Sequence, residues 1–97
     1  MSWAASKKLV IECLRNGNIQ YEQRNSIDVK NLLATGDVTA EVVLEVLSRA
    51  RGDEHRESPH HFDRAVTVHV VLRKGWYIKW YFLEPDAVFI SVHQEQD

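Results

Sequence analysis

The sequence lacks the features of a membrane-spanning or disulfide-linked protein. Cys13 is the only cysteine, which excludes an intramolecular disulfide and agrees with a reducing compartment. Lys, Arg or His interrupts the apolar stretches well before the roughly 18 residues that a transmembrane helix needs. Residues 1–9 lack the long apolar segment and the cleavage site of a signal peptide. We therefore expect a cytoplasmic protein that does not contact a membrane.

An excess of positive charge is also absent. The net charge is −2, whereas nucleic-acid-binding proteins usually carry a basic excess that displaces counterions. Any RNA-binding site must therefore be a local patch. The 97 residues suffice for one hydrophobic core and show no repeat, so we expect residues 1–97 to form one domain.

Helical periodicity dominates the N-terminal half. The pattern predicts helices over residues 4–15, between Ser26 and Gly36, and over residues 40–50, with an edge strand at residues 18–23. Ser26 and Thr39 are expected N-caps, and Gly36 and Gly52 are expected stops, because hydroxyl side chains accept from the first free N–H groups and glycine readily ends a helix.

In the C-terminal half the period changes to two. The alternation predicts strands at residues 65–72, 76–83 and 87–93, preceded by a polar segment, residues 53–64, that holds at most a short strand and a loop. The expected core face consists of Val66, Val68, Val70, Leu72, Trp76, Ile78, Trp80, Phe82, Val88, Ile90 and Val92. The predicted class is α+β: a small antiparallel sheet of these three strands plus one or two short ones, with two or three helices packed on one face.

Residues opposite one another in a sheet share a face, so the apolar alternation also predicts the register. Three-residue loops, 73–75 and 84–86, place Leu72 opposite Trp76 and Phe82 opposite Val88. A two-residue turn at Lys74 and Gly75 pairs Arg73 with Trp76 and is disfavoured by the same test.

This register predicts a polar group of side chains on the other face. Lys79 is expected between His69 and Ser91, and Tyr77 is expected beside His93. No acidic residue is expected along the strands on this face, so the group suits an anionic ligand.

Three other interpretations of these residues remain. The face can simply be solvated, as one face of an antiparallel sheet often is. A zinc site using His60, His61, His69 or His93 matches no compact ligand spacing, and no carboxylate is expected beside the strand histidines. Ser91 as a nucleophile lacks the strained turn such a residue usually occupies.

The side chains expected on this face are suited to metal-free RNA cleavage. RNA can be cut by its own 2′-hydroxyl, so a protein needs a base, an acid and cations for the charge on phosphorus. Histidine serves as acid or base, Lys79 with Arg56 or Arg64 can hold the phosphate, and the tyrosines Tyr77 and Tyr81 offer stacking surfaces.

Several segments carry a family resemblance that covers nearly the whole chain. The KKLV of the first helix, the DEHRES after the third helix and WYIKWYFLEPDAVFISVH resemble the MqsR toxins of the RelE-like group of mRNA interferases. The resemblance implies a compact α+β fold, metal-free mRNA cleavage and silencing by an antitoxin protein. It also implies roles for Tyr77 and Lys79, which match the family's Tyr-x-Lys strand motif, and for Arg56, which stands where the family has a lysine.

These arguments together predict a metal-independent endoribonuclease that needs no cofactor, with mRNA and a cognate antitoxin as partners. The predicted catalytic residues are His69, Tyr77, Lys79, His93 and Arg56. The predicted substrate-binding residues are His60, His61, Arg64, Tyr81 and Ser91. The rival hypothesis is a noncatalytic module that binds protein or RNA through the same surface.

Overall fold

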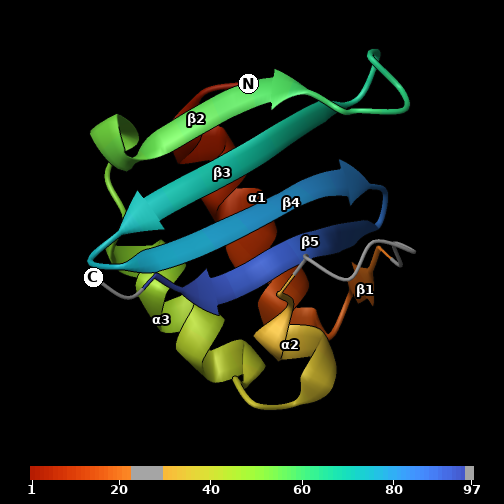
Figure 1. Ribbon diagram of the computed structural model, residues 1–97. Coiled ribbons are helices and arrows are strands. Elements are labelled where there is room, and N and C mark those ends of the chain that lie inside the picture. The colour runs from red at the N-terminus through yellow and green to blue at the C-terminus, as the bar shows by residue number, and fades with distance from the viewer. Residues whose placement is uncertain (23–29, 96–97) are drawn as a thin grey trace.

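The chain forms one mixed sheet with helices packed against one of its faces, which confirms the predicted α+β class (Figure 1). The computed structural model describes residues 1–22 and 30–95. In chain order the elements are α1 (Trp3–Asn16), β1 (Ile19–Tyr21), α2 (Leu32–Thr35), α3 (Ala40–Arg49), the 3-10 turn η1 (Gly52–Glu54), β2 (His55–Pro59), β3 (Thr67–Arg73), β4 (Trp76–Leu83) and β5 (Asp86–Gln94). The strand order is β1-β5-β4-β3-β2. Strands β2 to β5 are antiparallel, and β1 adds a parallel edge strand beside β5.

The helices begin and end largely where local chemistry predicts. Thr39 caps α3 by accepting a hydrogen bond from the Val42 N–H, as expected. That helix ends with Ala50 as its C-cap, and Gly52 begins η1 instead of stopping the helix. Gly36 ends α2 at a φ of 85°, a left-handed conformation that glycine adopts without strain. The expected cap Ser26 lies outside the described residues, and the described helix is capped by Asn31.

Helices α1 and α3 lie behind the sheet in the view of Figure 1 and enclose the core against it. Their apolar stripes, including Val10 and Leu47, join the buried Ile78, Trp80 and Phe89 of the sheet. The Trp3 indole and the Lys7 ammonium both donate to the Ala50 carbonyl at 3.1 Å, which fastens α1 to the end of α3. Within the described residues, no helix combines the length and the apolar run needed to cross a bilayer.

The turn between β3 and β4 differs from the prediction. It is a two-residue turn in which Lys74 and Gly75 have φ of 47° and 85°, the pattern of a type I′ hairpin, and Arg73 pairs with Trp76. As a result His69 and Val71 point toward the helices, while Val70 and Leu72 lie on the opposite face. The predicted core face of β3 was therefore wrong: the two-residue turn puts its apolar stripe on the side away from the helices and its mostly polar side, with Thr67 and His69, toward them.

The turn between β4 and β5 is also two residues long, Glu84 and Pro85, so Phe82 pairs with Ala87 rather than with Val88. A β-bulge between Lys79 and Trp80 then shifts the register by one residue. Beyond the bulge the strands resume the predicted pairing, in which Ser91 lies opposite Lys79. The bulge therefore compensates for the shorter turn.

Candidate functional site

The side of the sheet turned away from α1 and α3, called here the open face, carries most of the predicted site residues. Backbone pairing sets three rows of neighbouring side chains across it. The middle row consists of Arg56, Val70, Lys79 and Ser91. One flanking row consists of Leu72, Tyr77 and His93. The other flanking row consists of Ser58, Val68, Tyr81 and Val88. Directly paired side chains have Cβ atoms about 5 Å apart and diagonal ones about 7 to 8 Å. These rows include two cationic side chains and no carboxylate, so a small anionic group fits them.

The cationic part of the open face comes from Arg56 and Lys79, which Val70 separates in the middle row. Arg56 Nη1 donates to the carbonyl oxygens of Asp53 and His55, each at 3.0 Å, which holds the guanidinium beside the backbone at the start of β2. Within residues 1–22 and 30–95, no carboxylate forms an ion pair with Lys79. The ammonium is therefore available to a phosphate placed between the two cations.

Beside Lys79 lies an aromatic pair that the predicted register anticipated. The rings of Tyr77 and His93 stack with centroids 5.0 Å apart and planes inclined by 12°. Both side chains are half-buried, so their positions are held while their edges remain accessible. Lys79 is diagonal to His93 on the same face. An imidazole, a phenol and an ammonium thus lie within reach of one phosphodiester.

His60 lies next to Tyr81 but has a structural task. Its ring approaches that of Tyr81 edge-on at 5.1 Å, and the residue is buried. Its Nδ1 accepts from the backbone N–H groups of Phe62 and Asp63, and its Nε2 donates to Glu22 Oε1 at 2.7 Å. Because both ring nitrogens are engaged, we read His60 as the residue that anchors the loop before β3.

His61 and Arg64 are exposed in that same loop, between β2 and β3. The His61 ring contacts Phe62, whose side chain is 80% exposed. The loop lies at the Tyr81 end of the open face, since His60 in it contacts that ring. Both residues therefore border the open face without joining its three rows.

His69 does not belong to the open face, contrary to the prediction. It pairs with Trp80 on the helix side of the sheet, its ring stacks on the indole at 5.4 Å, and it is only 3% exposed. Burial lowers the pKa of His69 to about 4, and the neighbouring His55 adds to the decrease. His69 is thus separated from Lys79 and His93 by the thickness of the sheet, because the actual turn reverses the faces of β3.

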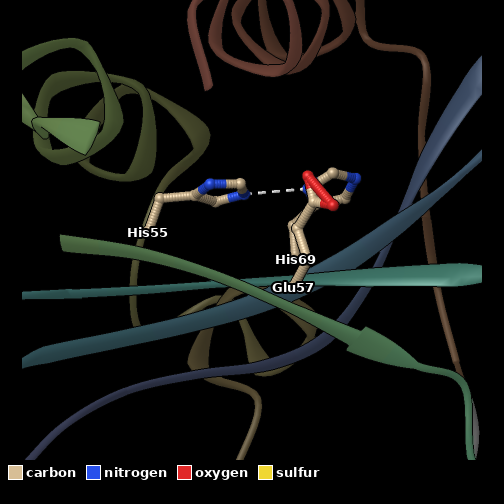
Figure 2. A group of neighbouring side chains, drawn as sticks. All are labelled: His55, Glu57 and His69. Carbon is tan, nitrogen blue, oxygen red and sulfur yellow. Dashed lines mark hydrogen bonds and ion pairs between the residues drawn. The ribbon is translucent and has the colours of Figure 1, made fainter. Parts of the chain in front are cut away.

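A second group of side chains surrounds His69, and sequence reasoning missed it. Strand β2 pairs with β3 so that Glu57 lies opposite His69, and His55, two residues earlier, points to the same side. His55 Nε2 lies 2.9 Å from His69 Nδ1, and Glu57 Oε1 lies 3.9 Å from that same Nδ1. Figure 2 shows the three side chains rising together from the strands toward α1. We call them the histidine–glutamate cluster.

The expectation that no carboxylate lies beside a strand histidine was therefore wrong. The sequence did contain a signal, since the H-x-E of residues 55–57 puts two metal-binding side chains on one face of any strand. What the sequence did not reveal was the partner, because the pairing of β2 with β3 depends on the conformation of the polar loop between them.

Comparisons of the chain with family models, with curated proteins and with solved structures give no match. The case for a function therefore rests on the geometry of the two faces and on the resemblance in sequence.

Proposed function

We propose that this protein is a metal-independent RNA endonuclease of the mRNA-interferase type, acting in the cytoplasm and silenced by a cognate antitoxin protein. The observation that supports the proposal most strongly is the pairing of β4 with β5, which puts Lys79 and Ser91 beside the stacked Tyr77 and His93. The match of Tyr77 and Lys79 to the Tyr-x-Lys motif of the MqsR toxins points in the same direction.

In the proposed reaction the RNA supplies its own nucleophile. A base removes the proton of a 2′-hydroxyl, the 2′-oxygen attacks the adjacent phosphorus, and the bond from phosphorus to the 5′-oxygen breaks. The products are a 2′,3′-cyclic phosphate and a 5′-hydroxyl end, and an acid supplies the proton that the leaving oxygen takes up.

The open face offers a group for each of these tasks. His93 is the proposed base, because an imidazole exchanges protons near neutral pH. The hydroxyl of Tyr77, whose ring stacks on His93, is the proposed acid for the leaving oxygen. Lys79 and Arg56 flank the position of the phosphate in the middle row and stabilise the charge that develops on its oxygens.

The remaining residues of the open face are suited to substrate binding. Ser91 lies opposite Lys79 and can hold a phosphate oxygen by a hydrogen bond. Tyr81 offers a surface on which a base stacks, and the exposed His61 and Arg64 border that end of the face. A bound strand would therefore run across the sheet from the stacked pair toward the loop before β3.

The test is RNA cleavage by the purified, untagged protein in EDTA. We expect the wild-type chain to cut a long transcript, to leave cyclic phosphate ends and to spare an analogue with 2′-deoxyribose throughout. His93→Ala should slow cleavage by about 100-fold or more, which is the usual range for loss of an acid–base group. Lys8→Ala, a change of an exposed lysine on α1, is the matched control and should cut at the wild-type rate. RNA that is bound but left intact would favour the noncatalytic module instead.

A further inference from the structure

The histidine–glutamate cluster contains the donor set of a transition-metal site. It offers two imidazole nitrogens and one carboxylate oxygen, and these three atoms lie within 4.8 Å of one another. Two histidines with one carboxylate are a common ligand set for zinc and for related first-row divalent metals. The cluster lies on the opposite side of the sheet from the residues proposed to cleave RNA.

The spacing of the donors is close to what a metal needs. Ligand atoms about 2.0 to 2.1 Å from a tetrahedral zinc lie about 3.3 Å from each other. The two facing nitrogens of His55 and His69 are 2.9 Å apart and point at each other, so they must separate by a few tenths of an ångström and each ring must turn until its lone pair points at the ion. The Glu57 oxygen lies 3.9 Å from His69 Nδ1, and the three donors lie within 4.8 Å of one another, so the carboxylate must move by about 1 Å; its side chain is 37% exposed and so has room to turn.

The surroundings hold the two rings in place. Trp3 of α1 stacks on His55 at 4.7 Å, and Trp80 of β4 stacks on His69 at 5.4 Å. Each imidazole therefore lies flat against an indole, a contact that the ring keeps when it turns within its own plane toward a metal.

A metal ion can reach the cluster from solvent, and a fourth coordination position remains open. Glu57 lies on the edge strand β2, so an ion can enter from the side of the sheet without opening the core. A cavity of about 310 Å³ adjoins His69 and Glu57 and is also lined by Met1, Thr67 and Phe82. A water molecule or a small ligand can occupy the fourth position of a tetrahedral ion from that cavity.

We propose that His55, Glu57 and His69 bind one Zn²⁺ ion, which ties the edge strand β2 to β3 beneath α1. When the ion binds, the proton shared between the facing nitrogens moves to the far nitrogen of its own ring, so that both facing nitrogens coordinate the metal. The ion replaces a single hydrogen bond between two rings by three bonds, so it stabilises the folded chain.

The experiment titrates ZnCl₂ into the untagged, EDTA-stripped chain by calorimetry and follows the thermal midpoint. We expect one Zn²⁺ per chain and a higher midpoint. Co²⁺ in place of zinc should give the visible absorption of a tetrahedral site and quench the fluorescence of the stacked indoles. His55→Ala and Glu57→Gln, both changed at the edge of the sheet, should each weaken binding by more than about tenfold.

His93→Ala is the matched control, since it removes a histidine from the open face and should bind zinc as the wild type does. Far-UV circular dichroism checks that each variant remains folded. Absence of stoichiometric binding to the wild type would overturn the proposal, and so would zinc binding that survives both His55→Ala and Glu57→Gln unchanged. Because RNA cleavage is measured in EDTA, failure of this site leaves the proposed nuclease untouched.

Discussion

Lys79 and Trp80 are neighbours in the chain, yet they lie on opposite faces of β4 in contrasting surroundings. Lys79 is half-buried between Val70 and Ser91 on the open face, with its ammonium available to a ligand. Trp80 is fully buried among the helices and stacks on His69. The polar residues of this sheet therefore form two separate groups, one on the open face and one enclosed beneath the helices, although the sequence mixes them within a few positions.

The largest effect is expected from truncating the buried side chain on the helix side of β4. Trp80→Ala should destabilise the chain by about 3 to 5 kcal/mol, because it leaves a cavity at the centre of the core. Urea unfolding followed by circular dichroism measures the change. A loss below 1 kcal/mol would show that the indole is not the centre of the packing.

Lys79→Ala should have the opposite profile. Cleavage of RNA in EDTA should fall by about 100-fold, since a cation that stabilises charge on the phosphate is lost. The free energy of unfolding in urea should stay within about 0.5 kcal/mol of the wild-type value, as is usual for a surface change. Lys79→Arg keeps the charge and should restore part of the rate. An Arg variant as inactive as the Ala variant would argue against a mainly electrostatic role.

A buried histidine on the helix side of the sheet should also make the free energy of unfolding depend on pH. Burial depresses the pKa of His69 from its ordinary 6.5 to about 4, so the unfolded chain takes up a proton before the folded chain does. Stability is therefore greatest above pH 6.5 and falls as the pH drops toward 4, by up to about 3 kcal/mol from this group alone.

Urea unfolding in EDTA at pH 7 and pH 4.5 measures this dependence for the wild type and for His69→Gln. The variant should lose less stability between the two values, because its amide does not titrate. Equal losses in the two proteins would show that His69 is not the group responsible.

The smallest effect concerns the turn that sets the two faces. Gly75→Ala should cost about 1 kcal/mol, because its φ of 85° strains any residue with a Cβ. Gly52→Ala is the matched control, since that glycine has no positive φ and only the Trp3 ring within 4.0 Å. If both substitutions had the same effect, the two-residue turn and the faces that follow from it would be in question.

Local signals in the sequence were sufficient for most of the fold. The stripe of α3 with its Thr39 cap and the alternation in β4 depend on neighbours within a few residues and were predicted well. In β5, by contrast, the expected core residue Val88 lies on the open face, because the pairing between the turn and the bulge is shifted by one residue. The parallel pairing of β1 was missed, because a three-residue strand carries too little pattern to reveal its partner or its direction.

The neighbours on the open face were predicted correctly only where the pairing of β4 with β5 determines them. Tyr77, Lys79, Ser91 and His93 lie together as expected, because a bulge restored the predicted pairing. His69 was assigned to the wrong face, since the apolar stripe of β3 lies on the open face and the length of the turn, not the alternation, decides which side meets the helices. The histidine–glutamate cluster depends on a pairing across the loop before β3, for which the sequence holds no periodic signal.

Amide chemical shifts can show directly whether RNA binds the open face. The measurement is a ¹H–¹⁵N titration of the metal-free chain with an oligonucleotide that carries 2′-deoxyribose and therefore stays uncut. We expect the shifts to change at Arg56, Tyr77, Lys79, Ser91 and His93, and to remain constant at the helix-side Val71 and Ile78 and along α3. Changes centred on the helix side, or none at millimolar ligand, would contradict the account.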